Sequence, residues 1–412
     1  MDVYDLIIIG GGAAGFMTAI TASESGVRKI KILEASSKFL EKVRISGGGR
    51  CNVTNASWLP NELIENYPRG GVKLLESFSR FATGDVYEWF ESRGLPLKIE
   101  SDQRIFPVSD SSIDVITCLK KYAVNGGIEM STKNYVKKII KEPSNLFKVF
   151  FQPDQFVLSQ KILISTGGHP SGHKLAKSLG HNIIKSIPSL FTFTCKDYGL
   201  GECAGASVKN INIKIILNEK IYKNKGDLLI THWGFSGPVI LKLSSIAARE
   251  LFNVKYNFKI VIRWSDLNFE QLKQNINNLR EKSGRFNLYN ARPIPYITKR
   301  LWISLLNKIN IDPDKKWSEI FSHEKEAIIN LLLHDEYQIK GKGPFGDEFV
   351  TAGGIDINEV NFKTMESLLV KGLYFSGEIL NIDGITGGFN FQHCWTSGWL
   401  AGKAISSANK KE

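Results

Sequence analysis

Three glycines near the amino terminus constrain the fold more than any other feature of this 412-residue chain. Gly10, Gly12 and Gly15 follow a β-branched run at residues 4–9 and open a run of small residues at 13–25 with helical spacing. Residues 29–34 then alternate as a second strand that ends in an acid, Glu34. This βαβ unit predicts a Rossmann-like α/β fold.

The same turn predicts a dinucleotide site. Gly10 permits a tight turn, Gly12 lets a pyrophosphate approach the backbone, and Gly15 lets helix and strand pack closely. The N–H groups and dipole of the helix N-terminus attract phosphates. Glu34, nineteen residues beyond Gly15, can accept hydrogen bonds from a ribose 2′-hydroxyl.

The periodicity changes along the chain and predicts an interrupted domain. Residues 74–94 and 112–125 have helical spacing, and 161–166 read as another buried strand. Residues 191–265 and about 336–349 predict a β-rich, barrel-like inserted domain, and 266–335 predict its helical subdomain. Residues 372–404 are again rich in glycine and other small residues, as the N-terminal region is. Residues 1–190 and 350–412 are therefore predicted to form one domain.

The positive charge of the chain is concentrated locally. The chain carries 53 basic and 41 acidic residues, a net charge of +12, and residues 273–300 hold seven basic residues and one acid. A local basic face favours a polyanionic partner, although a general lysine bias is the alternative. The candidates for an RNA-facing surface are Arg280, Lys282, Arg285 and Arg292.

The cysteines and the N-terminus exclude several classes. Five cysteines, an odd number without a C-x-x-C pair or Cys/His ligand spacing, argue against a disulfide framework and a zinc site, so no metal is predicted. The N-terminus carries Asp2 and Asp5 instead of a basic region, which argues against a signal peptide. We therefore expect a cytoplasmic protein with no membrane partner.

A glycine-rich string at residues 46–55 indicates which dinucleotide binds. Three consecutive glycines let backbone lie flat against a large planar group. With this string the chain resembles the two-domain FAD flavoprotein family that contains ribosomal-RNA dihydrouridine synthases and bile-acid 4,6-reductases, distantly similar to fumarate-reductase-type flavoproteins. The resemblance covers nearly the whole chain, through residues 10–15 with Glu34, 46–55, 104–107, 165–168, 231–238, 351–354, 364–367 and 372–390.

The resemblance implies FAD, with its adenosine on Glu34, its pyrophosphate on residues 10–15, and its flavin beside residues 372–390. A helix that begins near Gly387 would direct its N-terminus at the flavin edge that becomes negative on reduction. The predicted cofactor contacts are Gly10, Gly12, Ala13, Ala14, Gly15, Glu34, Ala35, Lys42, Ser46, Gly47, Gly48, Gly49, Arg50, Cys51, Asn52, Thr166, Gly167, Gly168, Gly377, Glu378, Gly387, Gly388, Phe389 and Asn390.

The candidates for catalysis beyond the flavin each have two interpretations. Cys51 either protonates a substrate carbon or packs against the flavin ring. His232 either faces substrate or holds its loop by hydrogen bonds. Arg50 and Arg104 can neutralise an enolate or a phosphate, and the alternative for Arg104 is that it fixes a turn at residues 106–107. His169, His173 and His393 lack metal spacing.

The implied reaction is hydride addition to the β-carbon of a carbonyl-conjugated alkene, with a proton added to the α-carbon. The substrate is a uridine of ribosomal RNA, favoured by the basic segment, or a small hydrophobic enone. A non-catalytic FAD-binding protein is the third alternative. Because the sequence has no second G-x-G-x-x-G unit, either NAD(P)H docks transiently over the flavin as the reductant or the electrons come from another source. The oligomeric state is left open.

Overall fold

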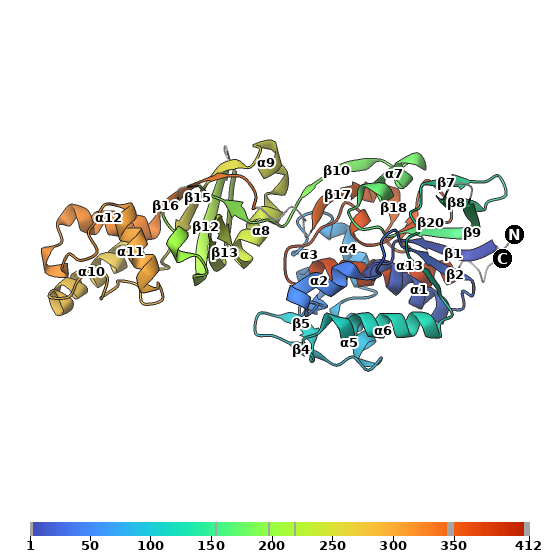
Figure 1. The fold of residues 1–412 in the computed structure, drawn as a ribbon, viewed down its shortest axis with the longest axis horizontal. Helices are drawn as coiled ribbons and strands as arrows, with labels where there is room; N and C mark the ends of the chain where they lie inside the picture. Colours follow the sequence, from blue (N-terminus) through green and yellow to red (C-terminus); the bar gives the residue numbers. More distant parts are fainter. Residues whose placement is uncertain (1–2, 153–154, 197, 218–219, 344–349, 408–412) are drawn as a thin grey trace. The chain divides into compact units, whose positions relative to one another are not determined.

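The computed structural model describes residues 3–152, 155–196, 198–217, 220–343 and 350–407. The chain divides into two compact units (Figure 1). The first unit spans Met1–Ser186 and Val350–Glu412, and the second unit spans Ile187–Phe349. We predicted domain bounds at 190 and 350 and a separate helical subdomain at 266–335. Whether these parts fold independently stays a prediction.

The first unit is built on a parallel sheet with β1 (Val3–Ile9) at its centre. β1 pairs in parallel with β2 (Ile30–Leu33) and β9 (Gln155–Ile164), so that Ile8 lies between Ile32 and Leu163. The strand order is β18 (Val360–Asn361), β19 (Glu366–Ser367), β20 (Leu373–Phe375), β9, β1, β2, β6 (Glu129–Ser131). Residues 6–9 are buried, which explains the continuous apolar run of this strand.

Smaller strands extend the first unit. β7 (Lys138–Lys141) and β8 (Phe147–Gln152) form an antiparallel hairpin that pairs with the first half of β9. Separate small sheets join β3 (Thr54–Asn55), β4 (Leu97–Ile99) and β5 (Arg104–Pro107), and β10 (Ile183–Pro188) with β17 (Thr351–Ile355). The sequence analysis missed these antiparallel pieces, because each is too short to show a period.

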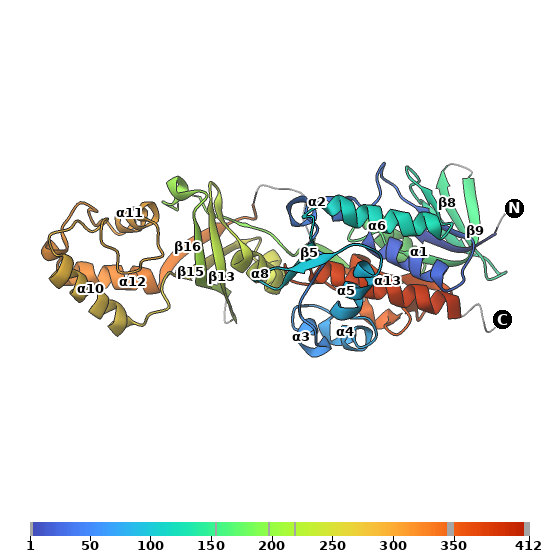
Figure 2. The same ribbon diagram turned by 90° about the horizontal axis from the view of Figure 1, so that it is seen from below.

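Helices α1 (Ala13–Glu24) and α13 (Phe389–Ser407) lie side by side across the sheet, although they come from opposite ends of the chain (Figures 1 and 2). A Cβ atom on Gly398 would lie 2.8 Å from Ala14 O and 2.9 Å from Met17 Cβ. The glycine therefore allows the two backbones to approach closely. This unit also contains the helices α2 (Glu41–Gly49), α3 (Pro60–Ile64), α6 (Ser112–Asn125) and α7 (Pro170–Ser178).

The helical spacing at residues 74–94 corresponds to two helices in the structure. α4 (Gly71–Phe78) ends before residue 79 and α5 (Thr83–Glu91) begins after Ala82. The Asp85 carboxylate accepts a hydrogen bond from Ala82 N at 2.7 Å, which satisfies a free N–H group at the start of α5. This capping contact starts a new helix where apolar spacing alone suggested continuation.

The second unit contains a six-stranded sheet whose edges meet. Its order is β11 (Phe193–Thr194), β14 (Gly234–Ser236), β13 (Lys220–Thr231), β12 (Ser207–Leu217), β15 (Asn257–Arg263), β16 (Asp335–Lys340). Directly beyond β16, Lys342 bridges Phe193, and Thr194 N donates to Gly341 O at 2.9 Å. The sheet thus closes into a barrel. Alternate residues such as Ile213, Ile215 and Ile260 are buried.

The helices of the second unit follow the barrel strands in sequence. They are α8 (Pro238–Ile246), α9 (Ala248–Asn253), α10 (Phe269–Ser283), α11 (Lys299–Lys308) and α12 (Ser322–Leu333), with the 3-10 helix η2 (Trp317–Glu319). Trp264, Trp302 and Trp317 are fully buried and join barrel and helices into one apolar core. The prediction of a Rossmann-like domain with a β-rich insertion is confirmed.

Within the described part of the chain, no helix combines the length and the apolar character that crossing a membrane would require.

Candidate functional site

The three glycines of the first turn each occupy a different environment. A Cβ on Gly10, which has a φ of +110°, would lie 2.5 Å from Ser165 O, and one on Gly15 would lie 2.2 Å from Gly10 O. A Cβ on Gly12 would meet nothing within 4 Å. No side chain caps the first turn of α1, where Ala13 and Ala14 lie. The turn therefore has an open backbone face and free N–H groups, as phosphate binding requires.

Glu34 lies at the carboxyl end of β2 beside this turn. Its Oε2 accepts a hydrogen bond from Gly11 N at 2.8 Å, and its Oε1 accepts one from Ser36 N at 2.7 Å. These contacts hold the carboxylate at the turn, while each oxygen keeps a lone pair for another donor. A ribose hydroxyl suits that acceptor. Ala35 follows and is exposed.

The glycine string makes an irregular end to α2. Ser46 is extended, with ψ at 150°, and Gly47 and Gly48 are left-handed, with φ at 57° and 69°. A Cβ on Gly48 or Gly49 would meet nothing within 4 Å, so one side of this backbone is open. An open, left-handed glycine backbone can lie against a flat ring, which a chain with side chains here could not do.

The string is joined to the predicted C-terminal flavin motif. Asn55 Nδ2 donates to Gly387 O at 3.0 Å. With its amide turned to suit its neighbours, Asn52 donates to Thr54 O and accepts from Gly388 N, both at 2.9 Å. Asn390 Oδ1 accepts from Gly384 N at 2.9 Å, and Phe389 begins α13. The N-terminus of α13 therefore lies against the glycine string.

Lys42 and Glu378 bring the remaining predicted contacts together. Lys42 Nζ donates to Glu378 Oε2 at 2.7 Å, and Thr351 N donates to Glu378 Oε1 at 3.0 Å. Cβ atoms on Gly167 and Gly168 would lie 3.6 and 3.5 Å from the two carboxylate oxygens. Residues far apart in the sequence thus form one polar cluster at the carboxyl end of β9.

Three buried polar atoms around Gly377 test whether a cofactor fits. Thr166 Oγ1, His173 Nε2 and His393 Nδ1 have no hydrogen-bond partner within the part of the chain that the structure describes. His393 Nε2 lies 3.3 Å from Gly377 O, and burial lowers the pKa of His393 to about 4. Buried polar groups are nearly always satisfied, so these three atoms are exceptions to a general rule. The uncapped N-terminus of α1, the open glycine backbone and the Glu34 carboxylate fit a dinucleotide such as FAD.

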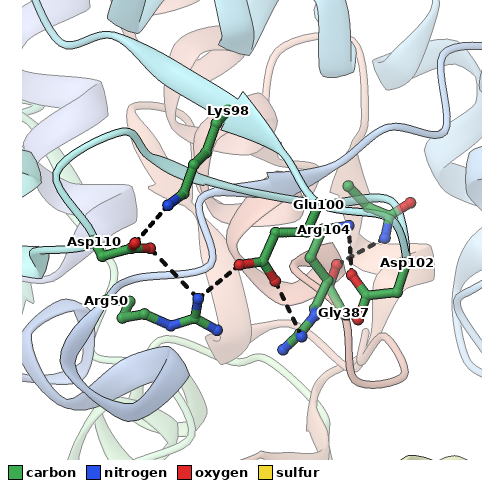
Figure 3. Close-up of polar contacts among 8 residues, drawn as sticks. Arg50, Lys98, Glu100, Asp102, Arg104, Asp110 and Gly387 are labelled. Atoms are coloured by element: carbon green, nitrogen blue, oxygen red, sulfur yellow. Dashed lines mark hydrogen bonds and ion pairs between the residues drawn. The ribbon is translucent and has the colours of Figure 1, made fainter.

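Arg50 and Arg104 belong to a network of ion pairs on the hairpin β4–β5 (Figure 3). Arg50 Nη1 lies 2.7 Å from Glu100 Oε1, and Arg104 Nη2 lies 3.2 Å from Glu100 Oε2. The Arg50 guanidinium lies 4.0 Å from the centre of the Phe106 ring. The alternative that Arg104 fixes a turn at 106–107 is wrong, because these residues lie within strand β5. Glu100 instead holds both arginines in place.

Cys51 lies at the core end of the string. Its side chain is 0% exposed. Burial raises the pKa of the thiol to about 12, against the opposing effect of a hydrogen bond with Ser46. The thiol is therefore neutral at physiological pH. Its burial favours packing over proton transfer to a substrate, and its catalytic role stays a prediction.

His232 is an exposed residue of the second unit, in the turn between β13 and β14. The turn is held by a hydrogen bond from Thr231 Oγ1 to Gly234 O at 3.0 Å and by one from Trp233 Nε1 to Thr192 Oγ1 at 3.3 Å. In the described ranges His232 itself makes no hydrogen bond, so the alternative that it holds its loop lacks support.

The candidate RNA-facing residues gather at the end of α10. Arg280 and Lys282 lie in its last turn, and Arg285 follows; all three are exposed, while Arg292 is half-buried. Considering described residues only, none of the four forms an ion pair with an acid. Asn277, Glu281 and Ser318 lie with Arg280 around a shared hollow.

The cofactor contacts predicted from the sequence do not include Asn55, Thr351, His173 or His393. Asn55 and Thr351 lie inside the motifs that carried the resemblance, so their positions were available. His173 and His393 were set aside for lack of metal spacing, and their burial could not be read from the sequence. Over the described residues, no group of three or more His, Cys, Asp or Glu side chains is placed to hold a metal ion.

Comparison with known proteins gives full-length matches. The chain is 28% identical over 419 residues to the ribosomal RNA dihydrouridine synthase of Escherichia coli strain K12, covering 99% of both chains. It is 28% identical to the 3-dehydro-bile acid delta(4,6)-reductase of Clostridium scindens, covering 97% of this chain and 98% of that protein.

Solved structures share the fold at lower identity. A flavocytochrome c3 fumarate reductase has a TM-score of 0.52 and 14% identity, covering 98% of this chain and 78% of that one. A 3-ketosteroid-delta4-(5alpha)-dehydrogenase from Rhodococcus jostii RHA1 has the same TM-score and 13% identity, covering 98% and 97%. The family described as "HI0933-like protein Rossmann domain" matches residues 4–404. The chain therefore belongs to the HI0933-like Rossmann-domain family of FAD-dependent oxidoreductases.

Proposed function

We propose that this protein reduces a uridine of ribosomal RNA to dihydrouridine in the cytoplasm, with FAD as its cofactor and NAD(P)H as the transient reductant. Two matched relatives, from Escherichia coli and Haemophilus influenzae, bear the name ribosomal RNA dihydrouridine synthase. In the reaction a hydride adds to the β-carbon of the carbonyl-conjugated C=C bond and a proton adds to the α-carbon. NAD(P)H then restores the two electrons.

The chain's own residues account for binding and orientation. When bound and reduced, the FAD cofactor would supply the hydride. The open turn at Gly12 and the free N–H groups of α1 suit its pyrophosphate, and Glu34 suits its ribose. The N-terminus of α13, fixed by Asn52 and Asn55, offers a positive dipole to a ring that gains negative charge on reduction.

The single observation that carries the RNA substrate is the cluster of basic side chains at the end of α10. Arg280, Lys282 and Arg285 are exposed and lack acidic partners in the described part of the chain. By contrast, Arg50 and Arg104 share Glu100, and each pairs with one further acid, Asp110 and Asp102 respectively. Exposed, unpaired cations supply most of the affinity for a phosphate backbone, and a small apolar substrate has no use for them.

A small hydrophobic enone is the second candidate substrate. The bile-acid reductase of Clostridium scindens is as similar to this chain, at 28% identity, as the dihydrouridine synthase. The chemistry of the two reactions is the same. The substrate class therefore depends on recognition outside the reacting atoms.

The deciding experiment is mass-spectrometric mapping of dihydrouridine in ribosomal RNA from a deletion strain, with and without the gene restored. We expect one dihydrouridine position to disappear on deletion and to return on restoration. Restoration with Arg280, Lys282 and Arg285 changed to Ala should fail, while the control that removes exposed Lys120 and Lys121 on α6 should succeed. Unchanged dihydrouridine in the deletion strain, with reduction of a hydrophobic enone by the purified protein, would favour the second candidate.

A further inference from the structure

The end of α10 and the helix η2 form a compact surface that we call the α10 site. It is defined by Asn277, Arg280, Lys282, Arg285, Phe286 and Ser318. Asn277, Arg280 and Ser318, with Glu281, line a polar hollow of about 470 Å³. Ser318 N donates to Gly284 O at 3.0 Å, which joins the two segments.

The cations of the α10 site are available to a ligand. Arg280, Lys282 and Arg285 are exposed, and within the described ranges no acidic side chain pairs with them. Lys315 of the same unit differs from these cations, because its Nζ lies 2.8 Å from Glu324 Oε2. Cations that the protein does not neutralise attract phosphate groups.

Phe286 adds an exposed aromatic ring directly after Arg285 in the chain. Its ring is 43% exposed, yet its backbone is fixed, since Phe286 N donates to Ser283 O at 2.9 Å and Trp317 N donates to Phe286 O at 3.1 Å. The Arg285 guanidinium lies 5.3 Å from the centre of the ring. Trp317 is fully buried, so the fixed segment is anchored in the core. A rigid, exposed ring beside free cations provides a stacking surface for a base.

We propose that the α10 site binds an unpaired nucleotide of RNA, with its base stacked on Phe286 and the neighbouring phosphates on Arg280, Lys282 and Arg285. In duplex RNA the faces of the bases are stacked on one another and cannot reach a protein ring. Asn277 and Ser318 offer donors and acceptors to a base edge or a 2′-hydroxyl. This inference rests on the proposed function and adds that the substrate RNA is recognised through a single-stranded or loop segment.

The test measures RNA binding by the full-length, FAD-loaded protein through fluorescence anisotropy. The probes are a single-stranded oligoribonucleotide of about 12 nucleotides and the same strand in a duplex. Phe286→Ala should weaken single-strand binding about 5- to 150-fold and leave duplex binding unchanged. Phe286→Leu keeps the bulk but not the π-face, and it should lose binding as well.

The matched control is Phe321→Ala. Phe321 is more exposed, at 61%, and the cation nearest its ring is Lys315, at 4.3 Å from the ring centre, which pairs with Glu324. This variant should bind RNA normally. Changing Arg280, Lys282 and Arg285 to Ala should make the slope of log affinity against log salt shallower by about two units for the single strand, whereas Phe286→Ala should keep the slope. Retained FAD and an unchanged melting curve show that each variant is folded.

The inference is overturned if Phe286→Ala leaves single-strand binding intact, weakens duplex binding equally, or acts no differently from Phe321→Ala. These results are distinct from a failure of the proposed function. If single-strand binding depends on Phe286 but no ribosomal uridine is reduced, the α10 site stands and the proposed reaction is wrong. If dihydrouridine forms while RNA binding does not depend on Phe286, the proposed reaction stands and the proposed stacking site is wrong.

Discussion

At the scale of single residues, Glu34 carries the clearest prediction about the cofactor. Glu34→Ala removes a charge-assisted acceptor from the ribose and also frees Gly11 N and Ser36 N. We expect FAD binding to weaken by about 1.5–3 kcal/mol, or roughly 10- to 150-fold in dissociation constant. Titration of the apoprotein with FAD measures this.

The matched control for that titration is Glu41→Ala. Glu41 is an acid near the same turn whose carboxylate pairs with Arg44, at 2.6 Å. FAD affinity should not change in this variant. Equal affinities in the wild-type protein and Glu34→Ala would show that the ribose is held elsewhere.

His393 predicts a dependence of stability on pH. Burial lowers its folded-state pKa to about 4, whereas an unfolded histidine titrates near about 6.5. Between these values the unfolded state binds more protons, so the contribution of His393 is fully present above about pH 6.5 and is lost as the pH falls toward 4. The slope reaches at most about 1.4 kcal/mol per pH unit.

Urea unfolding from pH 4.5 to 7 measures how the free energy of unfolding changes with pH. A variant of His393 then separates its contribution from that of other titrating groups. His393→Gln should show a shallower fall in the free energy of unfolding than the wild-type protein. His323→Gln, which changes an exposed histidine of the second unit, should keep the wild-type slope. Parallel curves for wild type and His393→Gln would exclude His393 as the source.

At the scale of elements, the contact between α1 and α13 depends on Gly398. A Cβ there would lie 2.8 Å from the backbone oxygen Ala14 O, and a backbone atom cannot move aside cheaply. Gly398→Ala should lower the free energy of unfolding by about 1–3 kcal/mol. The control Gly84→Ala changes an exposed glycine of α5 whose Cβ would meet nothing within 4 Å, and it should raise the free energy of unfolding by about 0.4–1 kcal/mol. If both substitutions have the same effect, the helices are not closely packed.

The elements also show where sequence reasoning succeeds. β1, α1 and β2 follow from a continuous apolar run, small residues and alternation, because a buried parallel strand and a closely packed helix demand those residues. α6 (Ser112–Asn125) matches its prediction for the same reason. The break at residues 79–82 depends instead on one capping carboxylate, Asp85, and the strands of the hairpin β7–β8 have only four and six residues. Neither leaves a period in the sequence.

The candidate site divides in the same way. The glycines at 10–15 and 46–49 could be predicted, since open backbone permits few other residues. The orphaned atoms of His173 and His393 could not, because only the fold shows that their nitrogens are buried without partners. Phe286 lay within the basic segment and became notable only when its ring proved exposed.

At the scale of the whole molecule, every predicted FAD contact lies in the first unit, and each unit has its own apolar core. FAD that binds only the folded first unit should stabilise that unit alone, by about 2.7 kcal/mol at a free concentration of 100 times its dissociation constant. Calorimetry should therefore show two unfolding transitions, and the melting temperature of one of them should rise with added FAD. Unfolding should also release fluorescent flavin, because no covalent attachment is expected. A Glu34→Ala protein should need more FAD for the same shift. If both transitions rise together, the two cores unfold as one, and flavin that stays with the acid-denatured chain would reveal a covalent bond.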